Sequence, residues 1–533
     1  MFSMQMISSA PLPPLQASIH IGASSISMLI LENHEDSEQD DCDFLEQSIP
    51  LARDIFKNGS VSRSTIERCV RILQGYLETL RELGATDETP IRAVTTNIIG
   101  EANNADVLSK RIQIACGLNV ENLDEGEMTR LIYLKTRRRL RDTPSMMKRT
   151  TLVIHSGPGN TRALLFKNGR IADYTNYRLG VYRTIEAIDS SQYERGSETS
   201  HTKLIREHTR SQISQIQHDY ESEKIEELVI IGYEVQHLAH ELAKPGKSTS
   251  TSRALANISS AILNMTEEQR VKTYKLDYNT AQAIIPALEI NLLISNALGV
   301  QTLRLPGSDY ERGLLLDLHT SYSLTHGFQR EVLRSAESLS RKFRVHRKHS
   351  SQVARLTESL FNATLELHKL GDHDALLLQC AAILHECGNF VSTRAHHKHS
   401  HYIISNSEIF GLGQRDINLI ALVARYHRRS GPKPNHAGYR DLTSNDRMRV
   451  SKLAAILRIA DALDRSHTSH IRDINISINK QKLILNLPTI SDASVERIAC
   501  GQKQICSETF TVSKSFCKMA VNFLLLNNNH TII

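Results

Sequence analysis

The sequence predicts an α/β protein over its first 325 residues, then an all-helical domain and a small α+β domain at the C-terminus. Strand-like and helix-like patterns alternate from residue 18 to about 325, which is typical of α/β architecture. From about residue 330 the apolar spacing is helical throughout, and the last 60 residues or so alternate again. No run of about 18 apolar residues appears, so we expect no membrane segment.

The two α/β parts open in the same way. Residues 18–31 and 151–166 each predict a strand, a turn of small residues and a second strand, which indicates a duplicated fold. Within the second part, Asn168 and Gly169 form the dipeptide that suits a type I′ hairpin turn. The predicted organisation is a loose tail at 1–17, a first lobe at 18–148, a second lobe at 149–325, a helical domain at 326–475 and a C-terminal domain at 476–533.

Basic residues and histidines gather in the helical domain. Residues 326–470 hold 22 Lys and Arg against 13 Asp and Glu, together with 14 of the 24 histidines. This composition favours an anionic partner, and a plain solvated basic surface is the alternative. Aromatic residues are only 5% and tryptophan is absent, so the stacking platform of a nucleic-acid binder is not expected. Eight cysteines without a CxxC pair predict reduced thiols and a cytoplasmic location.

One glycine turn has the form of a phosphate-binding loop. In the segment TLVIHSGPGNTRALLF, Gly157 and Gly159 allow a tight turn that leaves peptide N–H groups available to an anion. The turn is flanked by His155 and Arg162 and holds no carboxylate. The pattern therefore predicts phosphate binding and leaves hydrolysis at this loop open.

Several segments together resemble the exopolyphosphatase / guanosine pentaphosphate phosphohydrolase (Ppx/GppA) family. They are IHIGASSISMLI, NADVLSKRIQIACGLNVENLDEGEMTRLIYL, TLVIHSGPGNTRALLFKNGRI, HECGNFVSTRAHHKHSHYIISNSEIFG, LIALVARYHRR and LRIADALDRSH. The similarity runs from about residue 18 to the C-terminus. It implies two actin-like lobes of the ribonuclease H-like type, an HD-type helical domain and a small C-terminal domain.

The same resemblance implies a phosphate site in the lobes, but its charged groups are changed. His20 and His155 stand where the family loops have Asp, and Met128 stands at the catalytic Glu, with Glu127 beside it as the remaining candidate catalytic residue. Ile99 and Thr280 fall where phosphate-gripping arginines are expected. Losing one general base costs about 10²–10⁴-fold in rate. The phosphate-binding candidates are Gly22, Ser24, Ser25, Gly157, Gly159, Asn160, Thr161 and Arg162.

In the helical domain the resemblance implies an HD-type polar cluster, with or without a metal ion. Its members are His349, His385, Glu386, His399, His427 and Asp461, where Glu386 replaces the Asp of the pattern. Histidine and carboxylate ligands suit Mn²⁺, Fe or Zn²⁺. In the purely structural alternative, a helix-ending histidine satisfies a carbonyl and Asp461 pairs with Arg465. An anion-binding patch is expected at His397, Lys398, Arg425, Arg428 and Arg429.

These observations predict a Ppx/GppA-like protein with an eroded site in its lobes. It would bind polyphosphate or a phosphorylated nucleotide, with weak or no hydrolysis. The alternatives are an active exopolyphosphatase-type phosphoanhydride hydrolase, using Mg²⁺ or another divalent metal, and a phosphohydrolase that acts through the HD-type domain. The resemblance also implies a homodimer. We expect Gly22 and Gly157 to face each other across a cleft, and His349, His385, Glu386 and Asp461 to share one cavity, with His399 and His427 near its rim.

Overall fold

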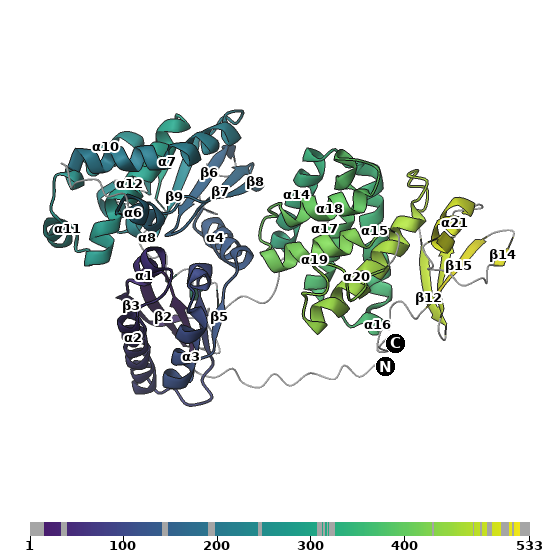
Figure 1. The fold of residues 1–533 in the computed structure, drawn as a ribbon, viewed down its shortest axis with the longest axis horizontal. Coiled ribbons are helices and arrows are strands. Elements are labelled where there is room, and N and C mark those ends of the chain that lie inside the picture. Colours follow the sequence, from purple (N-terminus) through teal and green to yellow (C-terminus); the bar gives the residue numbers. More distant parts are fainter. Residues whose placement is uncertain are drawn as a thin grey trace. The chain divides into compact units, whose positions relative to one another are not determined.

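The structure, a computed structural model of the full chain, describes residues 15–32, 40–140, 148–189, 198–242, 248–305, 312, 315, 316, 318, 326–428, 431–472, 474–479, 482–487, 493–502, 511–513 and 516–522. The chain forms two compact units, residues 1–323 and 324–533 (Figure 1). The first unit contains two α/β lobes, and the second contains a helical domain and a small C-terminal domain. Within the ranges given, no helix combines the length and apolar character needed to cross a membrane.

The first lobe is built on a five-stranded sheet with the order β3-β2-β1-β4-β5. Its strands are β1 (Leu15–Ile21), β2 (Ser25–Glu32), β3 (Asp40–Ser48), β4 (Ile91–Thr95) and β5 (Val120–Asn122). The first three strands form an antiparallel meander, and β4 and β5 continue the sheet in parallel. Strand β1 is buried along its whole length and starts before the predicted residue 18, because Gln16 and Ala17 pair with Leu31 and Ile30.

Four α-helices and one short 3₁₀ helix accompany this sheet. They are α1 (Leu51–Asn58), α2 (Arg63–Glu82), η1 (Asn97–Glu101), α3 (Ala105–Cys116) and α4 (Glu125–Leu140). Helix α2 begins at the Ser62 cap and buries an apolar face that includes Leu73 and Leu77. The Asn104 side chain, which its position suggests as a helix cap, instead bonds the backbone of Val61.

The second lobe repeats this strand order. Its sheet runs β10-β11-β9-β6-β7-β8, where β6 (Thr151–Ser156), β7 (Thr161–Lys167) and β8 (Arg170–Tyr177) form the meander and β9 (Glu227–Ile231), β11 (Thr302–Arg304) and β10 (Thr249–Thr251) follow. Asn168 and Gly169 both have positive φ between β7 and β8, as the hairpin prediction requires. The shared meander followed by parallel strands confirms the predicted duplication.

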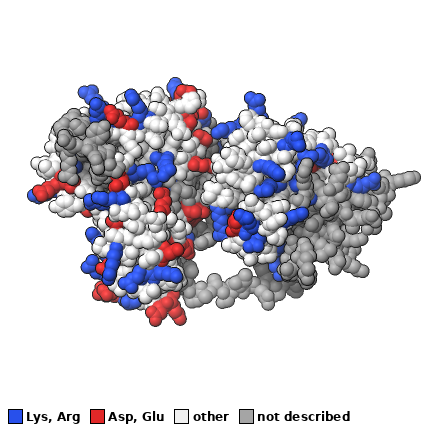
Figure 2. Space-filling view, viewed as in Figure 1, with Lys and Arg blue, Asp and Glu red and all other residues white. Residues whose placement is uncertain are grey.

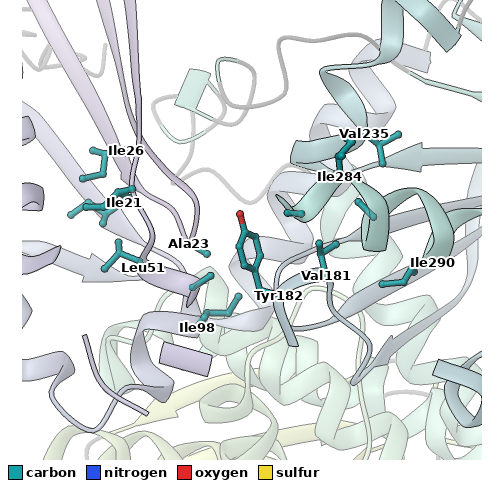
Figure 3. Close-up of a cluster of buried hydrophobic side chains, with 14 of the residues drawn as sticks. Ile21, Ala23, Ile26, Leu51, Ile98, Val181, Tyr182, Val235, Ile284 and Ile290 are labelled. Carbon is teal, nitrogen blue, oxygen red and sulfur yellow. The ribbon is translucent and has the colours of Figure 1, made fainter. Parts of the chain in front are cut away.

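Within the described ranges, seven helices accompany this sheet in the second lobe. They are α6 (Val181–Asp189), α7 (Glu198–Tyr220), α8 (Tyr233–Gln236), α9 (Ala239–Leu242), α10 (Ser252–Leu263), α11 (Glu267–Tyr274) and α12 (Tyr278–Ala297). One apolar cluster joins the two lobes. Figure 3 shows the ring of Tyr182 between side chains of the first lobe, such as Ala23 and Ile98, and side chains of the second, such as Val181. This continuous core brings the first strand–turn–strand segment of one lobe next to that of the other.

The helical domain consists of α14 (His326–Lys342), α15 (Arg347–Ala363), α16 (Leu365–His368), α17 (Asp372–Leu384), η2 (Cys387–Phe390), α18 (His396–Ser405), α19 (Gln414–Arg425) and α20 (Ser444–Leu463). Helix α17 is apolar on nearly all sides and packs against α14, α15, α19 and α20. On α15 the apolar stripe is buried at Val353, Leu356 and Leu360, and the helix ends at Ala363.

The small C-terminal domain is α+β. A four-stranded antiparallel sheet with the order β12-β13-β15-β14 contains β12 (Asn475–Asn479), β13 (Lys482–Leu487), β15 (Phe516–Asn522) and β14 (Thr511–Ser513). Helix α21 (Ser494–Gln502) packs against α20 of the helical domain.

Candidate functional site

Two matched turns lie at the ends of the first strands of the two lobes. After β1, the Gly22 N–H donates to the Ser25 carbonyl at 2.8 Å. After β6, the Gly157 N–H donates to the Asn160 carbonyl at 2.9 Å. A Cβ on Gly22 would lie 3.0 Å from the same Ser25 oxygen, so a larger residue would force the turn to shift by a few tenths of an ångström. The duplicated sheets therefore present equivalent glycine turns.

Both turns open into one cavity of about 70 Å³ between the lobes. This confirms that Gly22 and Gly157 face a common cleft. The described residues that line the cavity are His20, Gly22, Ala23, Ser24, Ser25, Thr96, Ile98, Met128, His155, Ser156, Gly157, Pro158, Asn160, Arg162, Tyr233 and Glu234. This volume has room for only a few water molecules, which suits a small anionic group rather than a whole nucleotide.

The polar wall of this cavity combines imidazoles, one guanidinium and one carboxylate. His20, His155 and Arg162 are buried, and an Arg162 guanidinium nitrogen lies 3.5 Å from His155 Nδ1. Glu234 is 2% exposed, and it comes from the first turn of α8, directly after β9. Burial and the nearby Glu234 charge raise the pKa of the Tyr182 phenol above its usual value, so this buried phenol stays neutral.

A second, more open pocket of about 280 Å³ adjoins the cavity and shares Ile98 and Asn160 with it. Its other described lining residues are Glu101, Gly159, Asn176, Arg178 and Arg183. Arg183 connects the lobes here. Its guanidinium donates to the Gly159 carbonyl at 2.9 Å and pairs with Glu101 of the first lobe at 3.2 Å. The two pockets form a path with arginines in its outer part and Arg162 in its inner part.

A separate cluster of histidines and carboxylates lies inside the helical domain. His349 comes from the first turn of α15, His385 from the end of α17, and Asp461 from the last turn of α20. The Nε2 atoms of His349 and His385 lie 3.4 Å and 3.5 Å from the same Asp461 carboxylate oxygen. Three helix ends that are far apart in sequence thus bring these side chains to one buried point.

The second ring nitrogen of each histidine is held by a separate partner. His349 Nδ1 lies 2.8 Å from a carboxylate oxygen of Asp464, and His385 Nδ1 lies 2.8 Å from the Ala382 carbonyl. Both side chains are fully buried, and neither Nε2 atom has a hydrogen-bond partner within the described ranges. The rings are therefore oriented so that both Nε2 atoms point at Asp461.

Three further imidazoles extend the cluster. His396 Nε2 lies 3.1 Å from His427 Nε2, and the His427 ring packs edge-on against His385 with centroids 5.0 Å apart. On the opposite side, His467 stacks on His349 at 3.8 Å. The His467 imidazole also lies 3.9 Å from Glu386.

The charges of this cluster are coupled. Burial lowers the pKa of His349, but the carboxylates of Asp461 and Asp464 outweigh it and raise the pKa to about 9. Burial, assisted by the His349 charge, lowers the pKa of His467. Burial also lowers the pKa of His396. At neutral pH His467 and His396 are therefore neutral imidazoles.

Comparison with known proteins agrees with this architecture. The model of the Ppx/GppA phosphatase family matches residues 45–321, and that of Ppx/GppA phosphatase domain III matches residues 332–496. The chain belongs to the Ppx/GppA phosphatase family. Its first unit contains the two duplicated sheets, and its helical domain corresponds to domain III of the family.

Ppx/GppA relatives align along most of the chain. A guanosine-5′-triphosphate,3′-diphosphate pyrophosphatase of Vibrio atlanticus is 22% identical over 493 residues, which are 91% of this chain and 96% of the relative. The protein of that name from Photobacterium profundum is 22% identical over 504 residues, 90% of this chain and 92% of its own. A solved structure, the Aquifex aeolicus member of the Ppx/GppA family, covers 58% of this chain and all of its own at 19% identity, with a TM-score of 0.45.

Most of the predicted loop residues line the cavity of this Ppx/GppA protein, but not all do. Gly22, Ser24, Ser25, Gly157, Asn160 and Arg162 line it, and Gly159 lines the adjoining pocket. Thr161 lies outside both linings, and its hydroxyl donates to the Leu179 carbonyl. Glu127 also lies outside, and its carboxylate accepts two hydrogen bonds from Arg130, the shorter at 2.6 Å. The sequence analysis did not identify Glu234, and the available signal is its position two residues after Gly232, at the end of the apolar run of β9.

In the helical domain the structure changes which residues form the predicted polar cluster. His349, His385, Glu386, His427 and Asp461 lie in the cluster, but α18 contributes His396 in place of the half-buried His399. Sequence reasoning missed His467 and Asp464, although both lie in the quoted segment LRIADALDRSH.

The expected anion patch is only partly on the surface. Lys398 is exposed, whereas His397 is buried with 8% of its surface accessible. Arg425 lies against the Tyr426 ring, and Arg428 lies 3.5 Å from His396 Nδ1. Arg429 lies outside the described residues. Figure 2 shows Lys and Arg spread over the visible face of the helical domain, with few acidic groups among them.

Proposed function

We propose that the cavity between the lobes binds the end of a phosphate chain, from polyphosphate or a phosphorylated nucleotide, without hydrolysing it by the carboxylate-and-metal route. One observation carries the proposal. The two glycine turns of the duplicated lobes meet at one cavity whose wall offers His20, His155 and Arg162 where the resemblance to the family leads one to expect acids. The wall is complementary to an anion rather than to a cation.

Binding is supported by donors that surround the cavity. The amide N–H groups of Ala23, Ser24 and Gly159 have no backbone acceptor among the described residues, so they are available to phosphate oxygens. The buried Arg162 adds a planar guanidinium, which suits phosphate geometry. An extended chain would place its terminal phosphate in the inner cavity and its next phosphates beside Arg178 and Arg183 in the outer pocket.

The same wall does not fit Mg²⁺. This ion requires nearly octahedral oxygen ligands, usually from one or two carboxylates, water and substrate phosphates. Among the described residues that line the cavity, Glu234 is the sole carboxylate, and both turn positions carry imidazoles. Met128 cannot accept a proton from water. Hydrolysis through a magnesium ion held by both lobes is therefore not part of the proposal.

A second candidate function is hydrolysis with Glu234 as the general base. Glu234 is a buried carboxylate that lines the cavity, which is the position a base needs. Under this alternative, phosphate release would disappear in Glu234→Gln. A third possibility, phosphohydrolysis in the helical domain, would instead survive Glu234→Gln and disappear in His385→Gln.

The deciding experiment measures binding and phosphate release together on the full-length protein. Long-chain polyphosphate and guanosine pentaphosphate are each titrated by calorimetry, and inorganic phosphate is assayed with Mg²⁺ present. We expect binding of at least one ligand with phosphate release at background. Arg162→Gln should weaken binding at least about tenfold, since a charged hydrogen bond is lost. The control Arg63→Gln, on the exposed face of α2, should bind like the wild type.

Two outcomes would reject the proposal. One is robust phosphate release by the wild type, whose origin the Glu234→Gln and His385→Gln variants would then assign. The other is binding of neither ligand. The competition between polyphosphate and nucleotide for the same site decides which source supplies the phosphate chain.

Two further parts of the proposal concern the protein's surroundings. The five cysteines whose side chains the structure describes, Cys69, Cys116, Cys380, Cys387 and Cys500, have free thiols, which supports a reducing, cytoplasmic location. Family resemblance supports a homodimer. Sedimentation of the purified chain as a monomer at micromolar concentration would reject it.

A further inference from the structure

We propose that the helical domain contains a transition-metal site formed by His349, His385 and Asp461. The site is independent of the interlobe cavity and of what that cavity binds. It would take one Zn²⁺, Mn²⁺ or Fe²⁺ ion, because imidazole and carboxylate donors suit these ions.

The first argument is the spacing of the donor atoms. Ligands about 2.1 Å from an ion in tetrahedral geometry lie about 3.4 Å from one another. The Asp461 carboxylate oxygen lies 3.4 Å from His349 Nε2 and 3.5 Å from His385 Nε2. One ligand atom each from His349, His385 and Asp461 fall within 4.8 Å of one another. Two edges of a coordination tetrahedron are thus already formed.

The second argument is the orientation of the imidazoles. A histidine that binds a metal through Nε2 usually donates its Nδ1–H to a carboxylate or a carbonyl, which fixes the ring. His349 has this arrangement with Asp464, and His385 has it with the Ala382 carbonyl. Asp464 is therefore assigned as a positioning residue.

The third argument is burial. His349 and His385 are 0% exposed, and their Nε2 atoms have no hydrogen-bond partner in the described part of the chain. A buried polar atom left without a partner is rare in folded proteins. A metal ion satisfies both nitrogens and the facing carboxylate at once.

The fourth coordination position falls on the side of Glu386. Its carboxylate oxygen, a nitrogen of His349 and a nitrogen of His467 also lie within 4.8 Å of one another. Glu386 has a side chain one methylene longer than the aspartate expected there, and it still reaches the cluster. Glu386 or a water molecule would complete the coordination, while His427 and His396 form the wall behind His385.

The test uses the full-length protein, treated with a chelator, dialysed and titrated with Zn²⁺, Mn²⁺ or Co²⁺ alone. We expect one tight equivalent per chain by calorimetry, and Co²⁺ should give visible absorption bands typical of a four- or five-coordinate site. His385→Gln and the nearly isosteric Asp461→Asn should each weaken binding by at least about 100-fold, since changes outside the ligand set already cost 10–100-fold. Asp464→Asn, which changes a positioning residue rather than a ligand, should weaken metal binding by about 10–100-fold.

His399→Gln is the matched control, because His399 is a half-buried histidine of the same domain that lies outside the cluster. It should retain the tight equivalent and the cobalt spectrum. Circular dichroism of each variant shows whether it is folded. If His385→Gln does not fold, Asp461→Asn still tests the site. Equal binding by wild type and a folded Asp461→Asn, or no tight equivalent in the wild type, would overturn the proposal.

Discussion

Replacing Gly180 by alanine should disrupt the second glycine turn without changing any group that would contact a ligand. Gly180 lies between β8 and α6 and packs directly on the loop that contains Pro158 and Gly159. Its φ is not in the left-handed region, so alanine meets no backbone strain there. The effect of the substitution is therefore steric alone.

The magnitude follows from the packing around Gly180. An ideal Cβ would lie well under 3.0 Å from the Cα and carbonyl carbon of Gly159 and from the carbonyl oxygen of Pro158. All three are backbone atoms, so no flexible side chain can move aside. The two segments would have to separate by about 1 Å, and overpacking of this kind costs about 1–3 kcal/mol. The same displacement would move the turn that faces the cavity.

The assay compares Gly180→Ala with Gly75→Ala, a glycine inside α2 that has open space around its Cα. The control should be neutral or gain about 0.5–1 kcal/mol, because alanine is the better helix residue. Gly180→Ala should lower the thermal midpoint of the first unit and weaken polyphosphate binding at least about tenfold. Metal binding by the helical domain should stay unchanged. If Gly180→Ala matches Gly75→Ala in both stability and polyphosphate affinity, the packing argument for the turn fails.

Three further changes test other parts of the structure. Met128→Glu alone should leave phosphate release near background, because His20 and His155 remain and groups that act together are not additive; a large gain in the phosphate assay would contradict this. Glu227→Gln should destabilise the second lobe by about 3–5 kcal/mol in urea unfolding, since it breaks a buried pair in which Arg304 donates at 2.7 Å and 2.9 Å. Burial raises the pKa of Asp446, but Arg415 and Arg449 outweigh it and hold the pKa below the usual 3.8. Its stabilisation is therefore complete above that value and lost as the pH falls further, so Asp446→Asn should lower the thermal midpoint at neutral pH and flatten its fall in acid; an unchanged acid profile would reject this.

Elements that depend on residues near each other in sequence can be read from the sequence alone. The predicted Asn168-Gly169 hairpin is confirmed and follows from turn chemistry, and the apolar faces of α2 and α17 follow from helical periodicity. The duplicated lobes follow from two similar openings in the sequence. These patterns were sufficient to predict that both glycine turns face one cleft.

Membership of the two candidate sites depended on packing between distant elements. Glu234 reaches the cavity because β9 pairs with β6 and ends beside the second turn. Glu127 was the candidate base because of its sequence position alone, but its carboxylate is paired with Arg130, one helical turn away. Neither result can be derived from residue spacing.

The histidine cluster shows the same division. The sequence by itself determined that histidines and acids occur at the ends of apolar helices, but four histidines in HHKHSH satisfy that description equally. In the tertiary structure it is His396 that joins the cluster. Gly388 lets α18 approach η2, and the Ser400 hydroxyl donates to the His385 carbonyl at 2.7 Å. This close contact sets the depth of α18 against α19, where His396 meets His427. Helix periodicity determines which side chains share a face, whereas the contact between helices decides which of them lies deep enough to reach a partner.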